Sequence, residues 1–135
     1  MVEHQAWSGR TTASSISPCA CPKRPAGPGG GTNPEQLFAA AYAACFHGAL
    51  SLLAAKAEIA IVGAKVEVTV DFGRDPVDGL FNLIAQVRIH LPGVELGVAE
   101  GLVRNTERFC PYAKMAREGI VSVVALARPA SEANL

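Results

Sequence analysis

The chain has 135 residues, 50% of them hydrophobic and 18% charged, which is enough for one domain with a buried core and excludes wholesale disorder. Basic and acidic residues number 12 each, so the formal net charge is zero. This balance excludes the basic surface of a nucleic-acid-binding protein, and no run of like charges predicts binding to a membrane surface.

The amino-terminal part of the chain reads as an irregular segment inside a single domain. Its first residues lack the charged start and apolar stretch of a secretory signal, which favours the cytoplasm and reduced thiols. Residues 18–31 contain four prolines and four glycines in fourteen positions, a density that breaks both helices and strands. We therefore expect one domain over residues 1–135, in which residues 1–31 form an amino-terminal strand and a proline- and glycine-rich loop.

A long apolar helix is predicted next. Thr32-Asn33-Pro34-Glu35 combines a capping residue, a proline suited to the first turn and an early carboxylate, and Thr32 with Glu35 fits a capping box. The following segment, 36–58, is apolar almost all round, although its apolar run of 37–53 is shorter than the ~20 residues that cross a bilayer. We predict a core helix, and since a 14.0 kDa chain can hardly surround it, a dimer that buries it.

The rest of the chain predicts an α+β fold. Residues 65–72 and 81–91 alternate between apolar and polar side chains and are joined by a polar turn, which is typical of an antiparallel hairpin covered on one face. Helices are expected over 94–109 and 111–118, the second opened by a proline and ended by a glycine. The apolar segment 120–127 predicts a final strand.

Four cysteines are candidates for chemistry. Cys45 lies in the middle of the long helix, where no end of that helix stabilises a thiolate, so a cation has to come from elsewhere. Cys110 precedes a proline at a predicted helix start, where backbone amides favour an anion. Either thiol could instead be a buried structural residue. Cys19 and Cys21 form a lone Cys-x-Cys pair, which favours surface thiols; a zinc-binding module is the alternative.

Three motifs carry a resemblance to a known family. They are Gly-Thr-Asn-Pro-Glu-Gln-Leu-Phe-Ala-Ala at 31–40, Tyr-Ala-Ala-Cys-Phe at 42–46 and Cys-Pro-Tyr at 110–112. Together they resemble the organic hydroperoxide resistance proteins, the Ohr branch of the OsmC/Ohr superfamily, over residues 31–127. The resemblance implies an α+β OsmC/Ohr-type fold, with an antiparallel sheet packed on a long central helix, in an intertwined homodimer.

The resemblance also implies a thiol-dependent peroxidase. Cys45 would be the peroxidatic cysteine, Cys110 the resolving cysteine, and Glu35 the carboxylate that orients a catalytic arginine. The thiolate of Cys45 would reduce an organic hydroperoxide to an alcohol and become a sulfenic acid, which Cys110 would convert to a disulfide. A dithiol of the dihydrolipoyl type would restore the thiols. No metal or prosthetic group is implied.

Two residues, Arg10 and Arg24, are candidates for the catalytic arginine that the resemblance implies. The Ohr branch carries it in an amino-terminal glycine-rich stretch that Ser8-Gly9-Arg10 resembles, which favours Arg10; Arg24 lies closer to where the OsmC branch supplies it. Trp7 resembles an aromatic residue of that branch. Ten residues of helix separate Glu35 from Cys45 by ~15 Å, so Glu35 would act on the site of a partner chain. Without a working arginine, the chain would be a redox-sensing or small-hydrophobic-ligand-binding protein, which is the alternative.

Aromatic side chains near the two thiols in the sequence favour an organic substrate. These are Phe38, Tyr42, Phe46, Phe109 and Tyr112. Each could equally be a core residue. An apolar pocket around the thiols would favour organic hydroperoxides over hydrogen peroxide, since burying an organic tail contributes ~25 cal/mol per Å².

Overall fold

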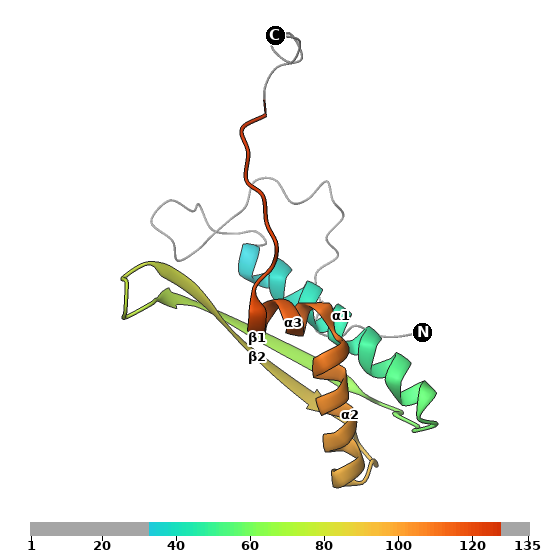
Figure 1. Ribbon diagram of the computed structural model, residues 1–135. Coiled ribbons are helices and arrows are strands. Elements are labelled where there is room, and N and C mark those ends of the chain that lie inside the picture. Colours follow the sequence, from blue (N-terminus) through green and yellow to red (C-terminus); the bar gives the residue numbers. More distant parts are fainter. Residues whose placement is uncertain (1–32, 128–135) are drawn as a thin grey trace, which may run out of the picture.

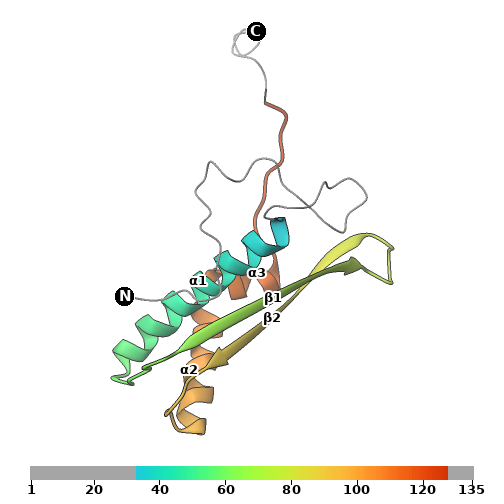
Figure 2. The ribbon, with the colours of Figure 1, turned by 180° about the vertical axis from the view of Figure 1, so that it is seen from behind.

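In the computed structural model, which describes residues 33–127, a long helix runs beside a two-stranded hairpin and two shorter helices follow (Figure 1; Figure 2 shows the opposite side). The elements are α1 (Pro34–Lys56), β1 (Lys65–Arg74), β2 (Phe81–His90), α2 (Leu96–Phe109) and α3 (Pro111–Glu118). The α+β class is confirmed, and these five elements lie within two residues of their predicted bounds.

The start of α1 is capped one residue later than predicted. Asn33 is the N-cap, and its side chain accepts a hydrogen bond from the N–H of Gln36 at 2.8 Å while the Gln36 side chain accepts one from the N–H of Asn33. The capping box therefore joins Asn33 to Gln36, whereas the predicted partner Thr32 lies outside the described residues. Pro34 occupies the first turn and favours the extended backbone that Asn33 adopts.

The hairpin has the register that the alternation requires. Val66 lies opposite Ile89 and Val68 lies opposite Val87, so the apolar side chains of both strands share one face. Part of this face packs against the core, to which α1 contributes most of the buried residues. The turn uses Gly79 at a φ of 73°, a backbone conformation that favours glycine.

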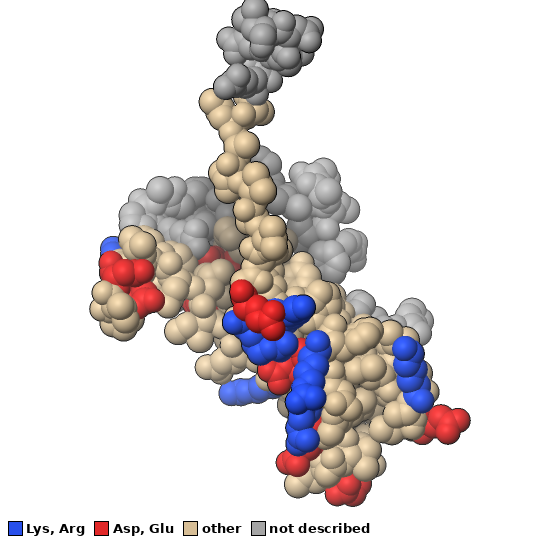
Figure 3. Space-filling model, in the orientation of Figure 1, with Lys and Arg blue, Asp and Glu red and all other residues tan. Residues whose placement is uncertain are grey.

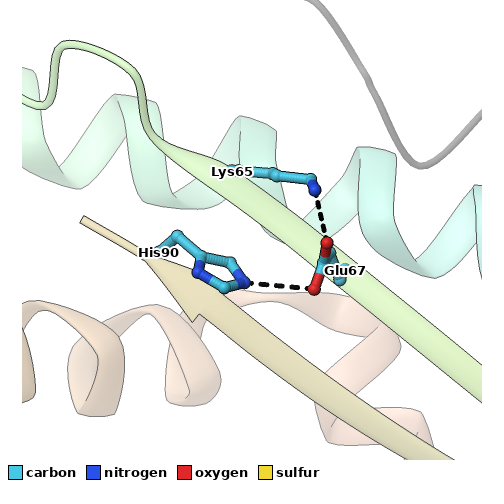
Figure 4. Close-up of polar contacts among 3 residues, drawn as sticks. All are labelled: Lys65, Glu67 and His90. Carbon is cyan, nitrogen blue, oxygen red and sulfur yellow. Dashed lines mark hydrogen bonds and ion pairs between the residues drawn. The ribbon is translucent and has the colours of Figure 1, made fainter. Parts of the chain in front are cut away.

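The opposite face of the hairpin is polar. At the end near the start of β1, Glu67 pairs with Lys65 on its own strand and with His90 on the neighbouring strand, 3.1 Å from its Nε2 (Figure 4). Lys65 and then His90 lower the pKa of Glu67. All three side chains are well exposed, so this group stabilises the fold only weakly.

One side of α1 forms most of the core. The buried residues of α1 are Tyr42, Ala43, Phe46, His47, Ala49, Leu50 and Ala54. They pack with Val66 of β1, Leu102 of α2 and Ala113 of α3. By length and composition alone α1 is also able to cross a membrane, but this packing is that of a core helix. The other side of α1 is partly exposed to solvent, as Leu52 shows with an exposed fraction of 44%.

The predicted final strand is absent from the described chain. Residues 120–127 have no regular structure and are fully exposed, extending away from the helices (Figure 1). Their side chains are uncharged, whereas acidic and basic side chains alternate over the face below them (Figure 3). A strand needs a neighbouring edge to supply its hydrogen bonds, and the described sheet contains only β1 and β2. The prediction is therefore wrong for a single subunit.

Candidate active site

The structure brings together two cysteines that are 65 residues apart in the sequence. Cys45, on α1, and Cys110, between α2 and α3, have their sulfur atoms 3.7 Å apart, a distance at which one thiol hydrogen-bonds to the other. Cys110 is fully buried and Cys45 is partly exposed, and neither is in a disulfide. The pair can form a disulfide once one sulfur is oxidised, since only a short approach separates them from a bond of ~2.05 Å.

Cys110 is held by the junction of two helices. Its N–H donates to the carbonyl of Thr106 at 2.8 Å and so ends α2, while its own carbonyl accepts from the N–H of Lys114 at 3.0 Å and so begins α3. The Thr106 hydroxyl is buried and donates to the carbonyl of Leu102 at 2.7 Å. The backbone of Cys110 is thus fixed on both sides.

The surroundings of Cys45 raise the pKa of its thiol, although one of them acts in the opposite direction. Burial raises the pKa of Cys45 most, neighbouring Cys110 raises it further, and a hydrogen bond from the backbone N–H of Tyr112 lowers it. Of the groups that shift this pKa, the backbone of Tyr112, in the first turn of α3, is the one that lowers it. Within residues 33–127, none of the groups that shift this pKa is a cation.

Three aromatic side chains, from α1 and α3, form a cluster. The ring of Tyr42 lies 6.0 Å from that of Phe38 and 6.0 Å from that of Tyr112, and the remaining pair is 6.4 Å apart. Burial, followed by Cys110, raises the pKa of Tyr42, so its hydroxyl stays protonated at neutral pH. These are three of the five predicted substrate-contacting aromatics.

An open, mainly apolar groove of about 550 Å³ adjoins this cluster. Its lining residues are Phe38, Pro111, Tyr112, Lys114, Met115, Gly119, Ile120 and Val121. The other two predicted aromatics lie elsewhere, since Phe46 is 3% exposed within the core and Phe109 is 52% exposed at the end of α2. A contact of Phe46 or Phe109 with substrate stays a prediction.

Of the predicted acid and arginines, only the acid, Glu35, lies within the described residues. Glu35 lies in the first turn of α1, ten residues before Cys45 on the same helix. The predicted positions Arg10 and Arg24 lie outside the described residues, as do Trp7 and the Cys19–Cys21 pair.

Histidines do not form a metal site in residues 33–127. His47 is buried on α1 with its Nδ1 3.3 Å from the Ser51 hydroxyl, and His90 lies on the polar face of the hairpin. In the same range, no three His, Cys, Asp or Glu residues are grouped so that they could hold a metal ion.

The site thus consists of two thiols at 3.7 Å, carried by a long helix and a helix junction on an α+β fold. The family model described as OsmC-like protein matches residues 27–124. The chain therefore belongs to the OsmC-like family, in agreement with the resemblance in the motifs.

Several known proteins are similar to this chain. The organic hydroperoxide resistance protein-like 2 of Staphylococcus epidermidis is 41% identical over 106 residues, which are 78% of this chain and 75% of that protein. The crystal structure of OhrB from Bacillus subtilis matches with 40% identity and a TM-score of 0.62, over 66% of this chain and 65% of that one. An organic hydroperoxide resistance protein from Legionella pneumophila matches with 37% identity and a TM-score of 0.66, over 74% and 72%. The chain thus spans less than two thirds of OhrB and about three quarters of the others.

Proposed function

We propose that this protein is a cysteine-based peroxidase that reduces organic hydroperoxides to alcohols. The observation that carries the proposal is the 3.7 Å separation of the Cys45 and Cys110 sulfurs. Membership of a family whose similar members are named organic hydroperoxide resistance proteins supports it.

The reaction uses the two thiols in turn. The Cys45 thiolate attacks the terminal peroxide oxygen, the O–O bond breaks, and the alkoxide takes a proton and leaves as the alcohol. The Cys45 sulfenic acid then condenses with the Cys110 thiol, which forms the S–S bond and releases water. A dithiol of the dihydrolipoyl type reduces the disulfide and is itself oxidised. The cytoplasm, where thiols are kept reduced, is the location that this chemistry favours.

A cation is needed because burial disfavours the thiolate of Cys45. An arginine meets this need, because it stays charged and offers a planar set of donors to both sulfur and peroxide. We propose Arg10 for this role, with Arg24 as the alternative, and Glu35 as the carboxylate that orients the arginine. No metal or prosthetic group takes part in the proposed reaction.

We propose a homodimer in which the partner subunit covers surfaces that one chain leaves open. Leu52 on α1 is 44% exposed, and Val121 and Val124 of the extended segment are 98% and 96% exposed. Apolar exposure of this extent is typical of an interface. The ten residues of helix between Glu35 and Cys45 also fit a site completed by Glu35 of the partner subunit.

The apolar groove whose lining includes the two residues after Cys110 is the proposed substrate site. Phe38 and Tyr112 line it, and Tyr42 contacts both of their rings. An alkyl, aryl or lipid tail can be buried there, whereas hydrogen peroxide has none. The proposed substrates are therefore organic hydroperoxides.

Turnover and intact mass test the proposal together. The wild type is expected to consume cumene hydroperoxide with dihydrolipoamide, and Cys45→Ser to lose this activity. One equivalent of peroxide is expected to lower the mass of the wild type by about two units, while Cys110→Ser gains about 16 as a sulfenic acid and, with a second equivalent, about 32 as a sulfinic acid. Turnover that persists in Cys45→Ser contradicts the assignment of the nucleophile.

The second candidate is a redox-sensing or ligand-binding protein without peroxidase turnover. It is favoured by one observation, that no cation of residues 33–127 lowers the pKa of Cys45. The two candidates differ in rate: oxidation of the thiols within seconds by one equivalent of peroxide supports the enzyme, and slow or absent oxidation supports the second candidate.

A further inference from the structure

Cys110 is the single residue between α2 and α3, which run in different directions (Figure 1). It is both the C-cap of α2 and the N-cap of α3, with an extended backbone at a φ of −69° and a ψ of 122°. The bond from its N–H to Thr106 belongs to α2, and the bond from Lys114 to its carbonyl belongs to α3. Since neither bond holds one helix against the other, Cys110 is the hinge of this junction.

A side-chain contact joins the two helices on the exposed side of the hinge. Arg117, in the last turn of α3, donates a hydrogen bond from its Nη1 to the carbonyl of Glu107 in the last turn of α2, at 2.9 Å. The same Nη1 lies 3.6 Å from Oε1 of the Glu107 side chain. The last four carbonyls of a helix have no partner within it and carry partial negative charge, so α3 supplies a cationic cap to α2.

We propose that Arg117 is a positioning residue for the disulfide step, because it restricts the hinge that carries the Cys110 sulfur. The two sulfurs are 3.7 Å apart and have to approach to ~2.05 Å. Hinge conformations that turn Cys110 away from Cys45 are lost when the bond forms, at a cost in conformational entropy. A contact that already excludes these conformations in the dithiol makes the disulfide more favourable, and by linkage the disulfide strengthens the contact.

The contact has a defined use in the proposed reaction. The Cys45 sulfenic acid either condenses with Cys110, which releases water, or is oxidised by a second hydroperoxide to a sulfinic acid. Arg117 favours the first outcome because it keeps Cys110 within reach. This meaning rests on the proposed function, but the equilibrium between dithiol and disulfide can be measured without any peroxide.

The measurement is the equilibrium of the thiol pair with reduced and oxidised dithiothreitol. The protein dithiol and the cyclic disulfide of the reagent exchange to give the protein disulfide and the reagent dithiol, so the reagent takes up the two electrons and two protons that the protein loses. Acid quenching and mass spectrometry of the Cys45 and Cys110 peptides give the ratio of the two forms. Arg117→Ala is expected to lower the equilibrium constant about fivefold, which makes the potential of the pair about 20 mV less negative.

Two further variants separate positioning from a general effect of charge. Arg108 is also exposed, in the last turn of α2, and within residues 33–127 its side chain makes no hydrogen bond to α3. Arg108→Ala is expected to stay within about twofold of the wild type, and Arg117→Lys, which keeps a charged donor, to recover most of the loss. An unchanged constant in Arg117→Ala, an equal loss in Arg108→Ala, or no recovery in Arg117→Lys overturns the proposal.

A peroxide assay tests the role in the disulfide step itself. With excess cumene hydroperoxide, Arg117→Ala is expected to accumulate about fivefold more sulfinic acid on Cys45 than the wild type in the same time. Equal amounts in the two proteins overturn this role. Because the exchange with dithiothreitol uses no hydroperoxide, absence of peroxide reduction in the wild type would contradict the proposed function and leave the exchange result unaffected.

Discussion

Truncation of two leucines on α1 tests both the core and the proposed dimer. Leu50 is fully buried on the inner side of α1, whereas Leu52, two residues on, is 44% exposed within one chain. Leu50→Ala removes buried carbon atoms and leaves a cavity, which is expected to lower the free energy of unfolding by about 3 kcal/mol. Leu52→Ala in an isolated subunit is expected to cost about 1 kcal/mol, since the side chain loses less buried area.

The proposed dimer changes the expected cost of Leu52→Ala but not that of Leu50→Ala. If a partner subunit covers the outer side of α1, Leu52 is buried in the assembly and Leu52→Ala is expected to cost about 2–3 kcal/mol. Unfolding of a dimer also depends on protein concentration, so the urea midpoint is expected to rise with concentration. Urea unfolding of the wild type and both variants at two protein concentrations separates these cases.

Two results would refute the reasoning. A cost below about 1 kcal/mol for Leu50→Ala would mean that the inner side of α1 is not the core, because full burial requires more. A cost of about 1 kcal/mol or less for Leu52→Ala, together with a midpoint independent of concentration, would refute a dimer that covers the outer side of α1.

Three further predictions follow from individual contacts. Asn33→Ala removes the cap of α1 and is expected to lower the free energy of unfolding by about 1 kcal/mol in urea titrations. The N–H groups of Gly97 and Val98 lower the pKa of Glu95, so its carboxylate stabilises the fold above the ordinary pKa and this contribution disappears as the pH falls through the lowered value. Glu95→Gln is expected to lower the urea midpoint at pH 7 and to match the wild type once the pH is below the lowered pKa of Glu95. Phe38→Ala is expected to raise KM for cumene hydroperoxide roughly tenfold and to leave turnover of hydrogen peroxide unchanged, in steady-state assays.

Much of the fold could be predicted because its signals are local. Alternation in 65–72 and 81–91 determined the hairpin and its covered face, and Pro111 with Gly119 determined α3. The final strand failed because a strand is defined by its neighbour, and residues 120–127 have none in the described chain. An apolar pattern indicates that the side chains of a segment are to be buried, but it does not indicate whether the same chain or another chain buries them.

The candidate site also has features that the sequence could predict and features that it could not. The resemblance placed Cys45 and Cys110 together, although a spacing of 65 residues gives no distance by itself. The lowering of the Cys45 pKa by the backbone of Tyr112 could not be predicted, because no residue type marks a backbone group and Tyr112 is on another helix. Phe46 and Phe109 were chosen for nearness in sequence, but their side chains lie in the core and at the surface.

The opposing effects on the pKa of Cys45 determine the role that the proposed arginine has in the reaction. Burial raises the pKa of this thiol more than the N–H of Tyr112 lowers it, so a helix end alone leaves the thiolate a minor species at neutral pH. A guanidinium beside the sulfur would reverse the balance. Arg10→Ala is therefore expected to lower kcat/KM for cumene hydroperoxide about a hundredfold, as removal of a charge-stabilising donor does, and Arg24→Ala to change it by less than about twofold. The reverse order would transfer the role to Arg24. If both variants keep wild-type turnover, no arginine at either position is needed, and the case for a guanidinium at Cys45 fails.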